Sequence, residues 1–227
     1  MTRIAVQPPA PSTFPTDQPE TGVRLHRVIC VGRNYADHAR EMGNDPDREP
    51  PFFFLKPAGA VVPSGRTIPY PPATDDLHHE AELAVLIGTG GADIAPERAL
   101  AHVWGQAAAN DLTRRDLQAR AKQMRRPWDM AKGFDNSAVL GTLHNGADLD
   151  GDRSIRCRVD GALRQEAPLS AMIWPVAEII AHLSRLLTLQ PGDLILTGTP
   201  AGVGPIARGQ TCTVEIDGLT PATVTLD

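Results

Sequence analysis

The amino-acid sequence predicts a domain of the α+β or the mainly β class. Many short apolar runs, each bounded by Gly, Pro, Asn or Asp, have the length of β-strands. Few stretches place apolar residues at helical spacing, and this scarcity of helices disfavours a doubly wound sheet. The chain shows no repeat at the period of a solenoid, and 227 residues suit one domain or one domain with a small appendage.

The first segment of the chain differs in composition from the rest. Residues 1–24 are rich in Pro and polar residues, so we expect an N-terminal arm with one short strand at 3–6. The main domain is expected to cover residues 25–227. Within it, we predict a polar, turn-rich loop at 43–51 and turns with short extended pieces at 60–78.

Strands are predicted where a short apolar run ends in a turn residue. The run 83–87, which Gly88 ends, is typical of a buried strand. The run 27–31 ends in the same way at Gly32, and the last third of the chain alternates apolar runs with turns. The other predicted strands are 52–55, 193–196, 211–216 and 222–226.

Helices are predicted from residue spacing and from proline position. Within 175–187 the apolar residues recur at helical spacing. These residues are Val176, Ile179, Ile180, Leu183 and Leu187. The segment 96–101 begins with Pro, which is favoured in the first turn of a helix. We also predict helices at 35–42 and 111–124.

Composition and charge narrow the classes of partner. The net charge of −5 argues against a nucleic-acid or anionic-membrane surface, and 4% aromatic residues are too few for a base-stacking platform. The dense basic spots at 114–115 and 125–126 suit a small anionic substrate. We expect no transmembrane helix and no signal peptide, because no run of 18 apolar residues is present and the first residues lack an apolar core.

The three cysteines bear on the cellular compartment. Cys30, Cys157 and Cys212 lie far apart in the sequence, and each lies in an apolar, strand-like context. We therefore expect buried thiols rather than a disulfide framework. Such thiols are typical of a reducing cytoplasm, so a cytoplasmic protein is expected.

Three carboxylates predict a site for a divalent cation. Glu80 and Glu82 lie two residues apart at the head of an apolar run, and in a strand both side chains point to one face. Asp111 follows a run of small residues later in the chain. Adjacent carboxylates repel each other and are costly to desolvate, and a cation removes both problems. Because the donors are hard oxygens without a thiolate nearby, Mg²⁺ or Mn²⁺ fits better than Zn²⁺.

Three further patterns are candidates for catalysis or binding. His38 and Glu41 lie three apart in a predicted helix, where a carboxylate can hold an imidazole in one tautomer and raise its basicity. Lys132 lies among small and apolar residues and can supply positive charge to an enolate or a carboxylate. The Gly-rich turn 197–204 follows an apolar strand and offers backbone N–H groups to an anion.

Each of these patterns also has a plainer explanation. Glu80 and Glu82 can be solvated side chains of an exposed edge strand. The spacing of His38 and Glu41 can be incidental on an exposed helix, where such pairs contribute little. Lys132 alone can be a surface lysine, and the Gly-rich segment can be an ordinary tight turn.

Six short motifs occur in order along the chain. They are GRNYADH at 32–38, FLKP at 54–57, HHEAEL at 78–83, NDLTRRDLQ at 110–118, AKGFD at 131–135 and PGDLILTGTPAGVG at 191–204. Each motif alone is weak, but their order and spacing together are specific. Together they resemble the fumarylacetoacetate hydrolase family, and the resemblance covers roughly residues 25 to 220. Within that family the chain is similar to the short acylpyruvate hydrolases.

The resemblance implies a fold, an assembly and a set of site residues. The fold is α+β, with mixed β-sheets that roll up on themselves around a central metal pocket. The assembly is a homodimer, which light scattering at micromolar concentration tests. The implied metal ligands are Glu80, Glu82 and Asp111, and the cation is Mg²⁺ or Mn²⁺. The implied catalytic residues are His38, Glu41 and Lys132, and the implied substrate contacts are Arg33, Arg115, Gln118 and Thr199.

The activity implied by the resemblance is hydrolysis of a C–C bond in a 3-acylpyruvate, a small anionic 2-oxo acid. The segment 50–57 resembles the branch that converts fumarylpyruvate to fumarate and pyruvate in aromatic catabolism. His38, oriented by Glu41, would deprotonate a water that attacks the distal acyl carbonyl. The enolate of pyruvate would then leave, stabilised by the cation and Lys132. The loop 43–51 would close as part of a lid.

Two rival functions stay open from the sequence. Oxaloacetate decarboxylation, found in the same family, needs the same cation and enolate stabilisation but no base that activates water. A non-catalytic, metal-stabilised binding protein on the same fold is the second rival. The presence of His38, Glu41 and Lys132 argues against it, because a binding protein has no need of a base beside the metal.

Overall fold

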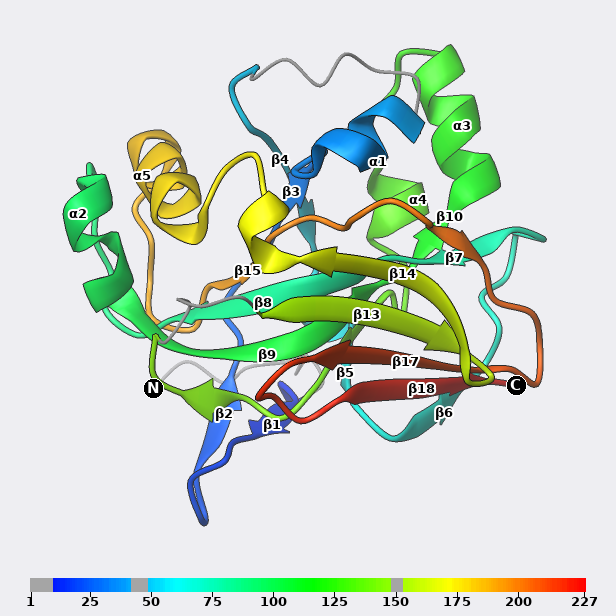
Figure 1. Ribbon diagram of the computed structural model, residues 1–227, viewed down its shortest axis with the longest axis horizontal. Helices are drawn as coiled ribbons and strands as arrows, with labels where there is room; N and C mark the ends of the chain where they lie inside the picture. Colours follow the sequence, from blue (N-terminus) through cyan, green and yellow to red (C-terminus); the bar gives the residue numbers. More distant parts are fainter. Residues whose placement is uncertain (1–9, 42–48, 148–152) are drawn as a thin grey trace, which may run out of the picture.

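Four β-sheets and a few short helices make up the molecule (Figure 1). The computed structural model describes residues 10–41, 49–147 and 153–227. The strands are β1 Thr13–Pro15, β2 Gly22–Arg24, β3 Val28–Gly32, β4 Phe52–Lys56, β5 Val61–Pro63, β6 Arg66–Ile68, β7 Leu77–His79, β8 Ala81–Ile87, β9 Val103–Asp111, β10 Thr113–Arg114, β11 Ala138–Leu140, β12 His144–Asn145, β13 Ser154–Val159, β14 Ala162–Pro168, β15 Leu194–Leu196, β16 Gly204–Pro205, β17 Thr211–Ile216 and β18 Ala222–Leu226. The helices are α1 Ala36–Glu41, α2 Pro96–Ala99, α3 Arg115–Gln123, α4 Asp129–Lys132 and α5 Val176–Leu186, with 3₁₀ turns η1 Ala58–Ala60, η2 Leu100–His102 and η3 Leu169–Ala171.

The largest sheet is mixed and has the strand order β4-β3-β15-β8-β9-β11-β5, with β12 paired to β9. A second sheet, β14-β13-β17-β18-β6, packs against one of its faces. Two smaller sheets, β10-β7-β16 and β1-β2, complete the fold. Mixed sheets with few helices confirm the predicted α+β class with sheets that curl on themselves.

The strand β8 lies at the centre of the core and is buried along its whole length. Leu83, Val85 and Ile87 face the second sheet, whereas Ala84 and Leu86 belong to an apolar cluster on the opposite face. A strand buried on both faces needs a continuous apolar run, and this is why the segment lacks alternating polar residues. Residues 80 and 82 share the face of Ala84 and Leu86, because side chains alternate along a strand.

Two groups of helices flank the sheets. In Figure 1, α2 and α5 lie side by side at one end, and α1, α3 and α4 gather at another. The predicted apolar stripe of α5 is confirmed, since Ile179, Ile180 and Leu183 are buried in the core. No helix of the described residues has the length and apolar composition that crossing a membrane requires.

The predicted helix at 111–124 is wrong at its beginning. Asp111 ends β9, where its backbone N–H donates to the carbonyl oxygen of Glu80 over 2.9 Å. Thr113 then pairs with His78 in the small sheet, and the helix begins only at Arg115. Tertiary pairing with β7 and β8 therefore overrides the helical tendency of the first four residues.

Several other predicted elements agree closely with the structure, whereas most of the loop predicted at 43–51 lies outside the described residues. The strands predicted at 211–216 and 222–226 match β17 and β18. The predicted helix at 35–42 matches α1, which the structure describes as far as residue 41. The three cysteines are buried as expected, and Cys157 Sγ lies 3.4 Å from Cys212 Sγ. The strand predicted at 3–6 lies outside the described residues.

The N-terminal arm contributes a hairpin, β1-β2, that was not predicted. Phe14 on β1 is only 1% exposed and belongs to the apolar cluster on the outer face of the large sheet. It shares that cluster with Leu25, Val28 and Leu143. The arm therefore completes part of the core and does not only extend from it.

A buried ion pair anchors the segment that precedes β15. Asp193 is fully buried and accepts hydrogen bonds from Arg27 Nη2 at 2.6 Å and from His26 Nδ1 at 2.9 Å. It also accepts the backbone N–H of Gln190. Burial alone would raise the pKa of Asp193, but these hydrogen bonds outweigh it and hold the pKa below its usual value.

We predict that Asp193→Asn lowers the free energy of unfolding by about 1–3 kcal/mol at pH 7, because Arg27 and Gln190 lose charged acceptor oxygens. The ionised carboxylate stabilises fully above the ordinary aspartate pKa of about 3.9 and loses its effect as the pH falls through its lowered folded-state pKa. The difference between wild type and variant should therefore shrink in acid. Urea unfolding at several pH values measures it, with the exposed Asp75→Asn as control. Equal stability at pH 7 would refute the prediction.

Candidate active site

Sheet register brings three carboxylates together at one end of the β8-β9 pair. Ala81 pairs with Asn110, so the preceding Glu80 lies opposite Asp111. Glu82 pairs with Ala109, and both point to the same face as Glu80 and Asp111. Oxygen atoms of the three carboxylates lie within 4.8 Å of one another, and all three residues are buried. The structure therefore brings the predicted metal ligands together and excludes a solvated edge strand.

Three basic side chains pair with two of these carboxylates. Lys132 Nζ lies 2.7 Å from Glu80 Oε2 and 2.8 Å from Asp111 Oδ2, so one ammonium bridges both residues. Arg115 takes the other oxygen of Glu80 at 2.5 Å, and Lys56 takes the other oxygen of Asp111 at 2.7 Å. Lys132 is 2% exposed, which excludes the surface position that its sequence context alone allowed.

These contacts shift the pKa values of the buried groups. Burial would raise the pKa of Glu80, but Lys132 and Arg115 outweigh it and lower that pKa. Burial would lower the pKa of Lys132, but Asp111 and Glu80 outweigh it and raise that pKa. An ionised carboxylate facing a protonated lysine is therefore the stable state of this pair.

The contacts of Glu82 differ from those of the other two carboxylates. Burial and the charges of Asp111 and Glu80 raise its pKa well above the ordinary value. Its Oε2 accepts the backbone N–H of Gly198 at 2.7 Å. Gly198 has φ of +96°, and an added Cβ would lie 2.7 Å from the Cβ of Asn34, so only glycine fits this turn. The Gly-rich turn thus donates a backbone N–H, and the acceptor is the protein's own Glu82 side chain.

The cluster fits a hard divalent cation. It offers three carboxylates within reach of one ion and no sulfur donor. No lysine or arginine of the described residues forms an ion pair with Glu82, whereas Glu80 and Asp111 each have such partners. A bound cation would supply the missing positive charge at Glu82 and would keep this carboxylate ionised.

Lys56 connects the site to the surrounding backbone. Its ammonium donates to the carbonyl oxygens of Leu112 at 3.1 Å, Ser137 at 2.8 Å and Lys132, in addition to its contact with Asp111. The side chain is fully buried. One ammonium thus joins β4, the end of β9, the end of α4 and the turn before β11.

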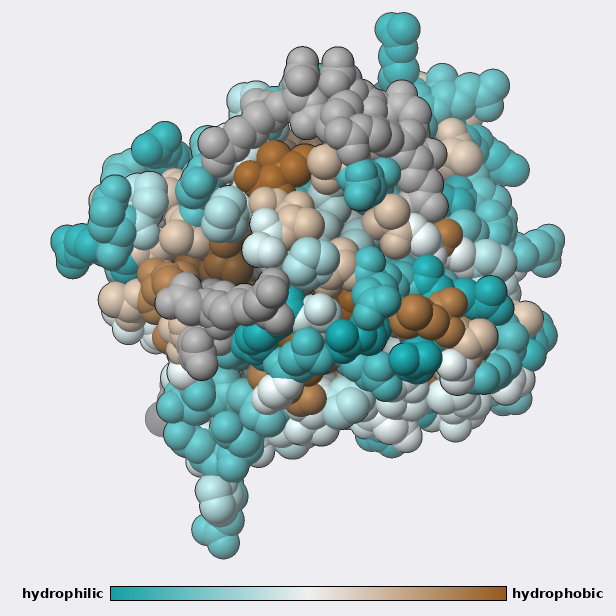
Figure 2. Space-filling model, viewed as in Figure 1, coloured by the Kyte–Doolittle hydropathy of each residue, from teal (hydrophilic) through white to brown (hydrophobic). Residues whose placement is uncertain are grey.

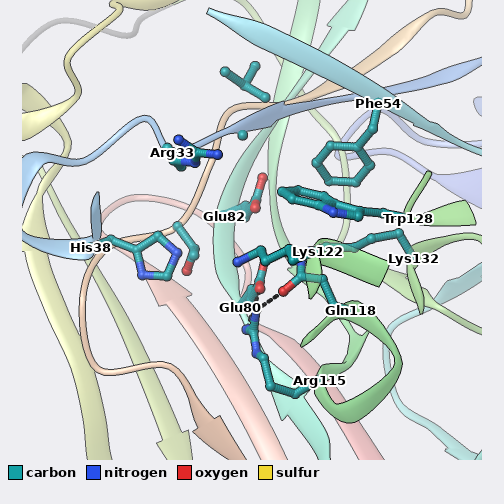
Figure 3. A pocket seen from close by; sticks show the side chains of 13 residues that line it. Arg33, His38, Phe54, Glu80, Glu82, Arg115, Gln118, Lys122, Trp128 and Lys132 are labelled. Atoms are coloured by element: carbon teal, nitrogen blue, oxygen red, sulfur yellow. Dashed lines mark hydrogen bonds and ion pairs between the residues drawn. The ribbon is translucent and has the colours of Figure 1, made fainter. Parts of the chain in front are cut away.

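A cavity opens over the carboxylates and is walled by basic and aromatic side chains (Figure 3). Predicted site residues that line it are Arg33, His38, Glu80, Glu82, Arg115, Gln118, Lys132 and Thr199. Asp111 lies behind Lys132 and contacts it directly. The cavity also has Lys122, Phe54 and Trp128 in its wall. The structure therefore gathers residues from five distant segments of the chain around one opening.

His38 reaches the cavity because the start of α1 is held in place. Asn34 Oδ1 accepts the backbone N–H of Trp174 at 2.7 Å, and its Nδ2 donates to the carbonyl of Thr197 at 2.8 Å. His38 is 6% exposed and close enough to Glu80 to lower the pKa of that carboxylate. The side chain of Glu41 lies outside the described residues, so the pairing of His38 with Glu41 stays a prediction.

One helix face supplies three polar groups to the cavity. Arg115, Gln118 and Lys122 lie at positions i, i+3 and i+7 of α3, so they share a face. Arg115 Nη1 donates to Gln118 Oε1 at 2.6 Å. Sequence reasoning missed Lys122, although its helical spacing from Arg115 and Gln118 was a usable signal. Trp128, also missed, lies in the segment that joins α3 to α4.

The chain is similar in sequence and structure to known proteins. Residues 27–227 match the family model described as fumarylacetoacetate (FAA) hydrolase C-terminal. A crystal structure of fumarylpyruvate hydrolase from Pseudomonas aeruginosa in complex with Mn²⁺ and pyruvate is 47% identical, with a TM-score of 0.93 over 99% of both chains.

Two characterised relatives carry other names. An oxaloacetate tautomerase of Arabidopsis thaliana is 43% identical over 195 residues, which is 85% of this chain and 87% of the relative. An oxaloacetate decarboxylase of Dictyostelium discoideum is 41% identical over 203 residues, which is 88% of this chain and 91% of the relative. With the family model matched over almost all of the described domain, this chain belongs to the fumarylacetoacetate hydrolase family.

Proposed function

We propose that this protein is a metal-dependent hydrolase that cleaves the C–C bond of 3-acylpyruvates, with fumarylpyruvate as the best candidate substrate. One observation carries the proposal: His38 lines the same cavity as Glu80, Glu82 and Lys132. A base, a cation site and a buried ammonium around one opening are the groups that hydrolysis to an enolate requires. The fumarylpyruvate hydrolase of P. aeruginosa supports the substrate class.

Glu80, Glu82 and Asp111 would hold the cation, which we propose to be Mg²⁺ or Mn²⁺. When bound, it supplies Lewis-acid stabilisation to the oxygens of a 2-oxo acid. Arg115 and Lys132 already contact Glu80. They can keep these contacts when Glu80 binds the cation, and they add positive charge to the cavity wall. Gln118 is held by Arg115 and faces the same space.

His38 is proposed as the base that takes a proton from water. It is buried beside the cavity, and its helix is fixed at the start by Asn34. Glu41, one turn later on α1, is proposed to hold the imidazole in the tautomer that can accept a proton. The hydroxide formed would attack the distal carbonyl carbon, and the C–C bond electrons would leave as the enolate of pyruvate.

Lys132 is proposed to stabilise that enolate. Its ammonium is held between Glu80 and Asp111, and its raised pKa keeps it charged. A fixed positive charge in a buried site stabilises developing negative charge without reorganisation during the reaction. Phe54 lies over this ammonium, with 5.0 Å from Nζ to the ring centroid, and shields it from solvent.

Two basic side chains at the cavity wall favour a substrate with a second carboxylate. Arg33 and Lys122 line the cavity, and among the described residues neither has an ion-pair partner. Each is held by an aromatic ring instead: Arg33 lies 5.1 Å from the centroid of Phe52, and Lys122 lies 5.3 Å from that of Trp128. Fumarylpyruvate carries a carboxylate on its acyl group, and the side chains of Arg33 and Lys122 can bind this carboxylate.

Oxaloacetate decarboxylation is the second candidate function. The relatives from A. thaliana and D. discoideum, at 43% and 41% identity, are named for reactions of oxaloacetate. This reaction would use the same cation site and Lys132 but would not need a base that activates water. A purely binding role explains less, because it gives no reason for His38 beside the carboxylates.

We predict that removing divalent metal abolishes acylpyruvate hydrolysis and that added Mg²⁺ or Mn²⁺ restores it, because the proposed reaction needs the cation for enolate stabilisation. Glu82→Gln should weaken Mn²⁺ binding measured by calorimetry, whereas the exposed Glu97→Gln should not. Full activity of protein that is free of metal by elemental analysis would refute the metal site.

We predict that His38→Ala lowers the kcat of hydrolysis by about 10²–10⁴-fold, the usual effect of losing a positioned base. Glu41→Gln should cause similar but milder loss. Mn²⁺ affinity should stay unchanged because all three carboxylates remain, and any oxaloacetate decarboxylation should survive better than hydrolysis. His102→Ala, outside the cavity, is the matched control. Hydrolysis within a few-fold of wild type, or loss of metal, would show that another group activates water.

We predict that Lys122→Met raises the KM for fumarylpyruvate by about tenfold, the effect of losing one charged hydrogen bond. The KM for acetylpyruvate, which has no second carboxylate, should change little. Steady-state kinetics with both substrates measures the ratio, and Arg120→Met on the exposed side of α3 is the control. Equal effects on the two substrates would place Lys122 elsewhere in the reaction.

A further inference from the structure

Gln165 joins the second sheet to the wall of the cavity. It lies on β14, is 1% exposed and is hydrogen-bonded to groups on β7, β8 and the segment after β15. Figure 1 shows that segment, in orange, running along the edge of β14. The approach is close, because a Cβ on Gly202 would collide with the carbonyl oxygen of Arg164.

Two backbone groups fix the orientation of the Gln165 amide. The N–H of Ala81 can only donate, so the atom that it meets at 3.0 Å must be the amide oxygen Oε1. The carbonyl of Pro200 can only accept, so the atom that it meets at 2.8 Å must be the amide nitrogen Nε2. Reversing the amide would set two donors against each other on one side and two acceptors on the other.

His79 reinforces this orientation. Its Nδ1 lies 2.9 Å from Gln165 Oε1, which accepts, so Nδ1 carries the hydrogen. His79 is fully buried. Its Nε2 has no hydrogen-bond partner in the described part of the chain, which agrees with a lone pair at that atom.

The fixed amide determines what the Thr199 hydroxyl can do. Gln165 Nε2 has two hydrogens: one goes to Pro200, and the other points to Thr199 Oγ1 at 2.8 Å. The hydroxyl therefore accepts from Gln165, and its own hydrogen is left to donate elsewhere. Thr199 lines the cavity beside Glu82 and His38.

We infer that Gln165 is a positioning residue that sets the Thr199 hydroxyl as a hydrogen-bond donor to an anionic oxygen of the 2-oxo acid. The inference rests on the proposed function for the identity of that ligand. The Ala81 N–H can only donate and the Pro200 carbonyl can only accept, so together they fix the Gln165 amide. The amide in turn fixes the role of the Thr199 hydroxyl in the cavity. The hydrogen bond that the Thr199 hydroxyl can still donate is thus determined from β14, a strand that contributes no residue to the cavity wall.

The test measures binding of pyruvate, which needs no turnover, by calorimetry with saturating Mn²⁺. Gln165→Glu has the same shape but cannot donate from its ionised form, so the Thr199 hydroxyl would turn to donate to it. We expect the Kd for pyruvate to rise about tenfold or more in this variant and equally in Thr199→Val, which lacks the hydroxyl. Thr199→Ser, which keeps the hydroxyl, should restore most of the affinity that Thr199→Val loses.

The double variant separates positioning from general damage. If Gln165 acts through Thr199, Gln165→Glu combined with Thr199→Val should bind pyruvate no more weakly than Thr199→Val alone. Gln165→Met, which adds no buried charge, should give the same non-additivity if the glutamate variant does not fold. Melting temperature and Mn²⁺ affinity of each variant report structural damage, which would be additive with Thr199→Val.

Each outcome decides between the two proposals. Pyruvate affinity within twofold of wild type in both Gln165 variants, or additive effects in the double variant, would overturn the role of Gln165. Coupled loss of pyruvate binding in a protein that hydrolyses no acylpyruvate would support Gln165 and overturn the proposed function. A wild-type protein that binds no pyruvate with Mn²⁺ would overturn both.

Discussion

The rest of this structure depends on one constraint: the negative charges of three buried carboxylates must be neutralised. Glu80, Glu82 and Asp111 share the end of one strand pair, and removing such groups from water costs several kcal/mol per ion unless partners meet them with good geometry. Lys132 and Arg115 meet that need from α4 and α3. The buried residue of α3 is Gln118 and those of α4 are Ala131 and Lys132, so the ion pairs add to a small apolar contact where these helices meet the strand ends.

The same constraint makes the site inseparable from the core. Lys56 binds three backbone carbonyls as well as Asp111, and so it joins segments that lie more than 50 residues apart. Gly198, which donates to Glu82, lies two residues after the end of β15, and Asp193 holds the segment that enters this strand. A displacement of β15 would therefore move the turn that holds Glu82. Side chains that never reach the cavity thus control its geometry, and Gln165 is one of them.

Local patterns in the sequence predicted much of the fold but not the contacts between distant segments. The spacing of Glu80 and Glu82 was sufficient to place both on one face, because strand geometry is local. Asp111 was assigned to a helix, since nothing nearby in sequence reveals that β9 extends to pair with residue 80. The burial of Lys56 and the role of Gln165 depend on partners that no periodicity identifies. Recognition of the family motifs supplied what local physics could not.

The position of Phe14 shows that the core begins earlier in the chain than the match to the family model. The match to the family model begins at residue 27, yet Phe14, which precedes that region, is buried in the same apolar cluster as Val28 and Leu143. The segment that the family model matches is therefore shorter than the segment that builds the core. A chain cut at residue 27 would leave the apolar side chains of Val28 and Leu143 without Phe14, so the start of the family match is a poor place to truncate the folding unit.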